Sequence, residues 1–274
     1  MINNCESYIR NLLDSAARYS FPELSKEAQA VLNLFTDYSA YNKVLMGIQT
    51  GSSGMFVATS MHWQDLFNRT INIDAQPMAI LAHAPVIWVY DISDTSGDPL
   101  PHQDELSHLI YPLKRDGLDE IRYADFVKAI QDYGIRYFEK KYAFNYGGCA
   151  ALRGRPHRPG DAHAAATPEY DILINSALDS GSKTWSLVHE LAHIFLGHIP
   201  IYEDPFKDNE KDSPTREIEA ETVTAIVADT LGYSQNLSVR YLSEYKEAFP
   251  EFQKNIRCEK LLKAAEKILQ LLPG

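Results

Sequence analysis

Apolar side chains recur at helical spacing in the first part of the chain. Residues 6–35 predict two helices divided around Pro22, and residues 38–46 predict a third short helix. From residue 56 to residue 92 the pattern changes to short β-branched and aromatic runs separated by turn residues, which is typical of strands. The first hundred residues therefore predict a small unit of helices and a sheet.

Helical periodicity dominates the second half. The predicted helices cover residues 123–141, 183–196, 215–231, 237–247 and 252–272, with a short strand at 172–175. As an edge strand, this segment can pair with an extended substrate through its backbone; as an ordinary core strand, it cannot. Residues 147–167 read as a long loop, a type of segment that in compact domains is usually functional or disordered.

The segment 93–106 is polar, rich in Pro, Gly and acidic residues, and has no sustained periodicity. We place the division of the chain here, with an N-terminal domain at 1–100, a linker at 101–120 and a C-terminal domain at 121–274. The predicted fold class is α+β, with a mostly helical C-terminal domain that contains a small sheet and a small α+β domain before it.

Composition excludes several classes of protein. The 274 residues are 45% hydrophobic and 23% charged, which argues against a disordered chain. No stretch reaches the 18 or more uncharged apolar residues of a membrane helix, and the N-terminus lacks the pattern of a signal peptide. Three widely spaced cysteines do not form a disulfide framework. We therefore expect a soluble cytoplasmic protein with reduced thiols and no membrane partner.

The net charge of −11 also limits the partners of this chain. Residues 1–100 hold only five basic residues against ten acidic ones. Because phosphate contacts supply most non-specific affinity for DNA, such a chain is a poor general duplex binder. Only a local basic patch can contact nucleic acid.

The most informative residues are the segment Leu-Val-His-Glu-Leu-Ala-His-Ile-Phe-Leu-Gly-His at positions 187–198. His189 and His193 are four residues apart, so on a helix they share a face and can bind one zinc ion, while Glu190 can act on a zinc-bound water. The alternative is a buried helix with two hydrogen-bonded histidines. The other faces of the helix are apolar, which favours a core helix with its histidines on a cleft.

A second predicted helix supplies acidic residues. Glu217 and Glu221 are four residues apart and share a face, whereas Glu219 points away and is expected to be solvated. We predict Glu217 as the third zinc ligand and Glu221 as a hydrogen-bond partner of a ligand histidine. Three protein ligands leave one position open, as in catalytic zinc sites, and one Zn²⁺ is expected per chain.

The residue after the helix also bears on the zinc chemistry. Gly197 is expected to end the first helix, which leaves His198 as an outer contact of the site or a plain surface histidine. For amide hydrolysis, Glu190 is the expected general base, and a further donor must stabilise the oxyanion. Tyr170, His198 and Tyr233 are all candidates, among which the sequence does not choose.

These motifs resemble the ImmA/IrrE metallopeptidases over roughly residues 120–235. The resemblance implies a zincin-like (gluzincin) fold and zinc ligands at His189, His193 and Glu217, with Glu190 as the base. It also implies a separate helix-turn-helix repressor as the substrate, encoded in a mobile-element, stress or phage-defence operon and often cleaved after DNA damage. A protease of this kind must be silent at rest, and the Cys149 thiolate can cap the open zinc position; a structural role is the alternative.

The front of the chain, from Tyr38 through Pro77-Met78-Ala79-Ile80-Leu81, resembles the N-terminal domain of ArdC-type antirestriction proteins. Such domains are associated with single-stranded DNA, which is therefore a candidate activator. The candidate contacts are basic residues with stacking from nearby aromatic side chains, including Trp63: Lys43, Arg69, Arg153, Arg155 and Arg158. The alternatives are a buried Trp63 and arginines that order a surface loop. The competing function is an antirestriction-type DNA-binding protein whose metal domain is structural or vestigial.

Overall fold

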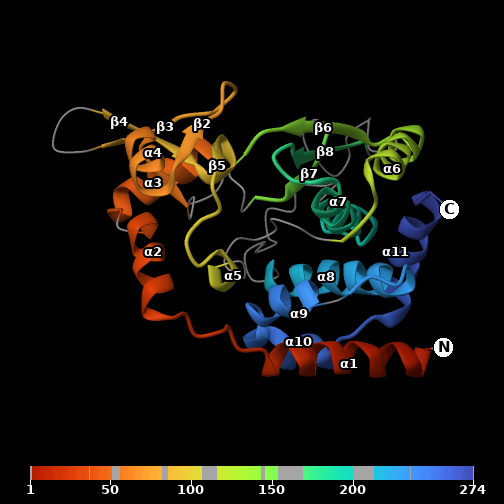
Figure 1. The fold of residues 1–274 in the computed structure, drawn as a ribbon. Coiled ribbons are helices and arrows are strands. Elements are labelled where there is room, and N and C mark those ends of the chain that lie inside the picture. Colours follow the sequence, from red (N-terminus) through yellow and green to blue (C-terminus); the bar gives the residue numbers. More distant parts are fainter. Residues whose placement is uncertain are drawn as a thin grey trace.

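The computed structural model describes residues 2–36, 38–50, 56–81, 86–106, 116–142, 146–153, 169–199, 213–234 and 236–273. Helices and short strands alternate along the chain in an α+β arrangement (Figure 1), which confirms the predicted fold class. None of the described helices is long and apolar enough to cross a membrane.

The N-terminal part combines helices with two small sheets. Its elements are α1 (Ile2–Arg18), α2 (Lys26–Thr36), α3 (Ala40–Thr50), β1 (Val57–Ala58), α4 (Ser60–Phe67), β2 (Arg69–Ile71), β3 (Met78–Leu81), β4 (Val86–Asp91), η1 (Ile92–Asp94), β5 (Thr95–Gly97) and α5 (Gln103–Leu106). The strands pair in the orders β1-β4-β3 and β2-β5, all antiparallel. Helix α4 lies inside the region predicted as strands. The side chain of Thr59 caps its first turn, and Trp63 and Phe67, four residues apart, bury one helical face.

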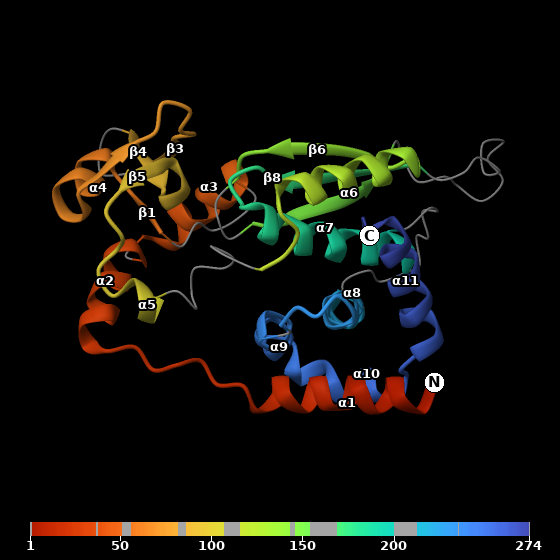
Figure 2. The same ribbon diagram turned by 45° about the vertical axis from the view of Figure 1, so that its right-hand side comes forward.

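The C-terminal part is mostly helical around a three-stranded sheet. Its elements are α6 (Glu120–Asp132), β6 (Arg136–Lys140), β7 (Gly148–Leu152), β8 (Tyr170–Asn175), α7 (Ser180–Phe195), α8 (Ser213–Thr230), α9 (Asn236–Ser243), η2 (Lys246–Ala248), α10 (Phe249–Lys254) and α11 (Cys258–Leu271). Figure 2 shows the sheet, α7, α8 and α1 as successive layers. Helix α7 thus lies between the sheet and α8, which places its side chains where both neighbours can reach them.

The sheet of the C-terminal part corrects two expectations and decides between the two alternatives for residues 172–175. The helix predicted over 123–141 ends at Asp132, because Gly134 turns the chain with φ +100° and residues 136–140 form strand β6. Part of the loop predicted at 147–167 is strand β7. The strand order is β6-β8-β7, so β8 is the central strand and not an edge strand open to a substrate.

The hydrophobic core groups α1 with the C-terminal part. Cys5, Ile9 and Leu13 lie on one face of α1 and pack with buried side chains of α6–α11. Buried residues between positions 28 and 106 form separate clusters in the N-terminal part. The predicted boundary groups residues 1–18 with the N-terminal domain, whereas their side chains pack against the C-terminal one because α1 contacts α9 and α11.

Candidate metal centre

Helix α7 carries the two histidines of the His-Glu-x-x-His motif. The Asp179 side chain caps its first turn by accepting a hydrogen bond from the Ser182 N–H. The side chains of Leu187, Leu191 and Ala192 are buried. Because the apolar faces of α7 fill the core, its histidine face is left for α8, which packs against it.

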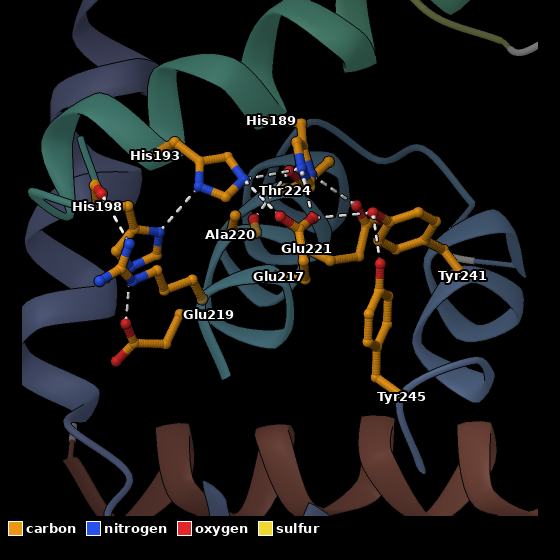
Figure 3. Close-up of polar contacts among 11 residues, drawn as sticks. His189, His193, His198, Glu217, Glu219, Ala220, Glu221, Thr224, Tyr241 and Tyr245 are labelled. Atoms are coloured by element: carbon orange, nitrogen blue, oxygen red, sulfur yellow. Dashed lines mark hydrogen bonds and ion pairs between the residues drawn. The ribbon is translucent and has the colours of Figure 1, made fainter. Parts of the chain in front are cut away.

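Helix α8 brings Glu217 to these histidines (Figure 3). The Nε2 atoms of His189 and His193 are 3.1 Å apart. Glu217 Oε2 lies 3.3 Å from Nε2 of His189, and its Oε1 lies 3.5 Å from Nε2 of His193. Ligand atoms bonded at about 2.1 Å in a tetrahedron around zinc are about 3.4 Å apart. The three side chains therefore have the donor types and the mutual spacing of a zinc site.

These ligand candidates open onto a cavity of about 500 Å³. Residues 146–150 form one wall, and residues of α7, α8 and α9 together with His198 and Ile199 form the rest. Glu190 also lines the cavity, where its carboxylate accepts a hydrogen bond from the Ala150 backbone N–H. Burial raises the pKa of Glu190. A carboxyl group with a raised pKa beside a metal position suits proton transfer.

Glu221 lies on the same face of α8 as Glu217 and contacts the Nδ1 side of the His189 ring. Its Oε2 is 3.1 Å from His189 Nδ1, which therefore carries a hydrogen and turns Nε2 toward the metal position, where a metal displaces the Nε2 proton. Burial lowers the pKa of His189, but hydrogen bonds to Glu217 and Glu221 outweigh it and raise the value to about 10. Burial likewise acts to raise the pKa of Glu217, but the two histidines hold it below its usual range.

Glu219 lies elsewhere than the sequence predicts, whereas His198 lies at one of its two expected positions, as an outer contact of the site. Glu219, expected to be solvated, is partly buried with its Oε2 2.8 Å from His198 Nε2 and 3.4 Å from Lys260 Nζ. The other ring nitrogen of His198 lies 3.0 Å from His193 Nδ1. His198 lines the cavity, but both of its ring nitrogens are already engaged, which argues against the expected oxyanion role.

The two tyrosines expected as oxyanion donors do not reach the cavity. The Tyr233 hydroxyl donates to the Gly117 carbonyl, and neither Tyr233 nor Tyr170 is among the described residues that line the cavity. Sequence reasoning missed Tyr241 on α9, which lines the cavity and donates its hydroxyl hydrogen to Glu217 Oε2 at 2.8 Å. No local motif marks Tyr241, because only the packing of α9 on α8 brings it to the site.

Cys149 lines the cavity but is not part of the metal-ligand group. The group of described side chains able to hold a metal contains His189, His193 and Glu217. Side chains alternate across a sheet, and Cys149 pairs with Leu173 on the face opposite the buried Ile174. The Cys149 side chain is exposed and hydrogen-bonds with Tyr146. In this conformation Cys149 does not cap the metal position.

Several candidate DNA contacts are engaged within the protein. Arg69 donates to Thr95 Oγ1 and to backbone carbonyls of β5 and the following turn. Arg153 pairs with Glu169 and Asp171. Trp63, proposed for base stacking, is fully buried and donates to the Tyr90 carbonyl. Lys43 is exposed on α3. The remaining two candidates, Arg155 and Arg158, lie outside the described residues.

Comparison with known proteins confirms the resemblance seen in the sequence. Residues 150–231 match the model of a peptidase family described as the IrrE N-terminal-like domain. The matched segment contains α7 and α8, and thus His189, His193 and Glu217. This family supports a metallopeptidase in this part of the chain and therefore implies a metal.

Among solved structures, the antirestriction protein ArdC from the R388 plasmid, in a metal-free crystal structure, is similar at 14% sequence identity. The likeness covers 99% of this chain and 97% of that chain, with a TM-score of 0.38. ArdC is the type of protein that the N-terminal residues resemble, although a TM-score of 0.38 does not establish a common fold. No curated protein matches the sequence significantly.

Proposed function

We propose that this protein is a zinc-dependent endopeptidase. The observation that carries the proposal is the spacing of the three ligand atoms, 3.1, 3.3 and 3.5 Å, beside the Glu190 carboxylate in one cavity. Two imidazoles and one carboxylate form the ligand set of many catalytic zinc sites. Zinc held there supplies a water of lowered pKa and polarises the carbonyl of the substrate.

The residues around the cavity divide the proton chemistry. Glu190 takes the proton of the attacking water and later gives it to the leaving amine, because its carboxylate lines the same cavity as the ligands. The Tyr241 hydroxyl is our proposed oxyanion donor, and in this role its hydrogen turns from Glu217 Oε2 to the substrate oxygen. Burial raises the pKa of Tyr241, so the hydroxyl keeps the hydrogen that such a donor needs.

Strand β7 supports an extended peptide as the substrate. Its described pairing partner is β8 on one side, and residues 148–150 line the cavity. A substrate segment added along β7 gains backbone hydrogen bonds and passes over the metal position. An extended segment of this kind is found in linkers and exposed loops of folded proteins, so we propose a folded partner protein with one such segment as the substrate.

The resemblance to ImmA/IrrE and ArdC proteins supports a more specific proposal. We propose a separate helix-turn-helix repressor as the cleaved partner and single-stranded DNA as the activating signal. The described residues offer Tyr41 and Lys43, both exposed on α3, as contacts for a single strand.

The test is incubation of the zinc-loaded protein with the product of the neighbouring gene, with and without a single-stranded oligonucleotide. We expect one discrete cut, mapped by mass spectrometry of the fragments, and faster cleavage with the oligonucleotide. Glu190→Gln is the matched control, because it retains the three ligands and removes the base. Equal cleavage by Glu190→Gln and wild type would refute the assignment of the base. Zinc retained by a His189→Ala, His193→Ala double variant would refute the metal site.

A further inference from the structure

The C-terminal end of α7 folds back on the metal centre. Gly197 adopts φ +67°, and the Gly197 and His198 N–H groups donate to the carbonyls of Ile194 and His193 at 3.0 and 2.9 Å. This pair of bonds closes a Schellman motif, which needs a residue at positive φ and here has glycine. The turn brings the His198 ring over His193, with ring centroids 5.0 Å apart.

Glu219 and Lys260 hold the Nε2 side of the His198 ring, which faces away from His193. Its Nε2 lies 2.8 Å from Glu219 Oε2, a carboxylate that can only accept, so Nε2 carries the hydrogen. Lys260 on α11 holds the same oxygen at 3.4 Å. The Nδ1 of His198 is left as a lone pair facing His193 Nδ1 at 3.0 Å. It accepts the His193 Nδ1 hydrogen and directs the His193 Nε2 lone pair toward the other ligands (Figure 3).

We infer that His198 is a positioning residue, which together with Glu219 and Lys260 fixes the tautomer and ring orientation of His193 for metal binding. This inference rests on the proposed zinc site. It completes a symmetric arrangement, because Glu221 does the same for His189 directly. On the Nδ1 side of His193, the imidazole of His198 provides the link to Glu219 on α8.

Two isosteric substitutions test the inference at His198. In His198→Asn the amide oxygen replaces Nδ1 and keeps an acceptor for His193. In His198→Gln the amide stands where Nε2 was, so it keeps the contact to Glu219 and loses the one to His193. His62→Gln is the matched control, because His62 is exposed on α4, far along the chain from the site.

The measurement is the zinc dissociation constant by competition with a chelating dye, with the absorption spectrum of the cobalt-loaded protein as a second readout. Loss of the partner of a ligating histidine weakens metal affinity about 10- to 100-fold. We expect this loss and an altered cobalt spectrum in His198→Gln. In His198→Asn and His62→Gln we expect affinity and spectrum close to those of wild type.

Two outcomes overturn the inference. One is wild-type zinc affinity in His198→Gln, and the other is equal weakening in the Asn and Gln variants, which would indicate general disturbance of the helix end. Thermal unfolding of the zinc-free proteins shows whether each variant folds. Failure of the proposed function is a different result, because wild-type protein would then bind no zinc through His189 and His193.

Discussion

A methyl group added at Gly148 would collide with the centre of the sheet beside the cavity. A Cβ at this position would lie 2.7 Å from the Leu173 carbonyl oxygen and 2.7 Å from Ile174 Cδ1. The first atom belongs to the backbone of the central strand, and the second belongs to a fully buried side chain. Gly148→Ala therefore forces β7 away from β8.

The size of the effect follows from the overlap. Carbon and carbonyl oxygen approach to about 3.3 Å at closest, so the strands must separate by about 0.6 Å. Overpacking of this kind costs about 1–3 kcal/mol, or roughly 5- to 150-fold in the unfolding equilibrium. The same shift moves the Ala150 N–H away from Glu190, which couples the stability change to the site.

Urea unfolding of the zinc-free protein, followed by circular dichroism, measures this cost. We expect a lower midpoint for Gly148→Ala with an unchanged slope. Gly47→Ala is the control, because a Cβ at this position in helix α3 meets nothing within 4 Å. Alanine in place of glycine inside a helix stabilises by about 0.5–1 kcal/mol, so the two substitutions should have opposite signs.

A third variant identifies which contact is responsible. Ile174→Val removes Cδ1 and leaves the Leu173 carbonyl oxygen in place. If the carbonyl is the main obstacle, the Gly148→Ala substitution stays destabilising in the Ile174→Val background. Full recovery in that background would show that the side chain alone resists the methyl group. Unchanged or raised stability of Gly148→Ala itself would refute the described packing of β7 on β8.

Three further predictions concern the site and the junction between the two parts of the chain. Tyr241→Phe should lower kcat for cleavage of the partner protein about 100- to 1,000-fold with zinc content unchanged. Tyr245 contacts Tyr241 and not Glu217, so Tyr245→Phe should keep most of the activity. An equal loss of kcat in both variants would contradict the oxyanion role of Tyr241. Lys141→Met should lower the free energy of unfolding by about 1.5–3 kcal/mol because it strips a buried carboxylate of its partner. That carboxylate is Asp94, 2.8 Å from Lys141 Nζ, and the exposed Lys128→Met should stay within about 0.5 kcal/mol in the same urea titration. Zinc at 100 times its dissociation constant should raise the free energy of unfolding by about 2.7 kcal/mol, and an unchanged midpoint would contradict the metal site.

The part of the site that lies on one helix could be predicted from the sequence. The four-residue spacing of His189 and His193 fixes their common face whatever else the chain does. Glu217 and Glu221 follow the same rule on α8, and the structure places both beside His189. What the spacing cannot give is the pairing of α7 with α8, which depends on the buried side chains between them.

The incorrect predictions concern residues whose surroundings are set by a neighbouring element of the fold. Glu219 points away from Glu217 on its own helix, which predicts a solvated side chain, but the turn at Gly197 brings His198 to meet it. Cys149 lines the cavity, yet the register of β7 on β8 turns its side chain to the face of the sheet opposite Ile174. Periodicity also predicts one helix from residue 123 to residue 141 through Gly134, whereas residues 136–140 form strand β6.

Helix α8 shows why the site and the fold depend on each other. It packs in the core through Ile218, Ala220 and Val223 and still carries three carboxylates that are buried or partly buried, at Glu217, Glu219 and Glu221. Buried carboxylates are tolerated only when each is paired, and here the partners are the motif histidines, directly or through His198. The histidines are therefore needed to hold α8 against α7 even before a metal binds. Loss of His189 removes one partner from both Glu217 and Glu221, so a stable core and a metal site depend on the same residues.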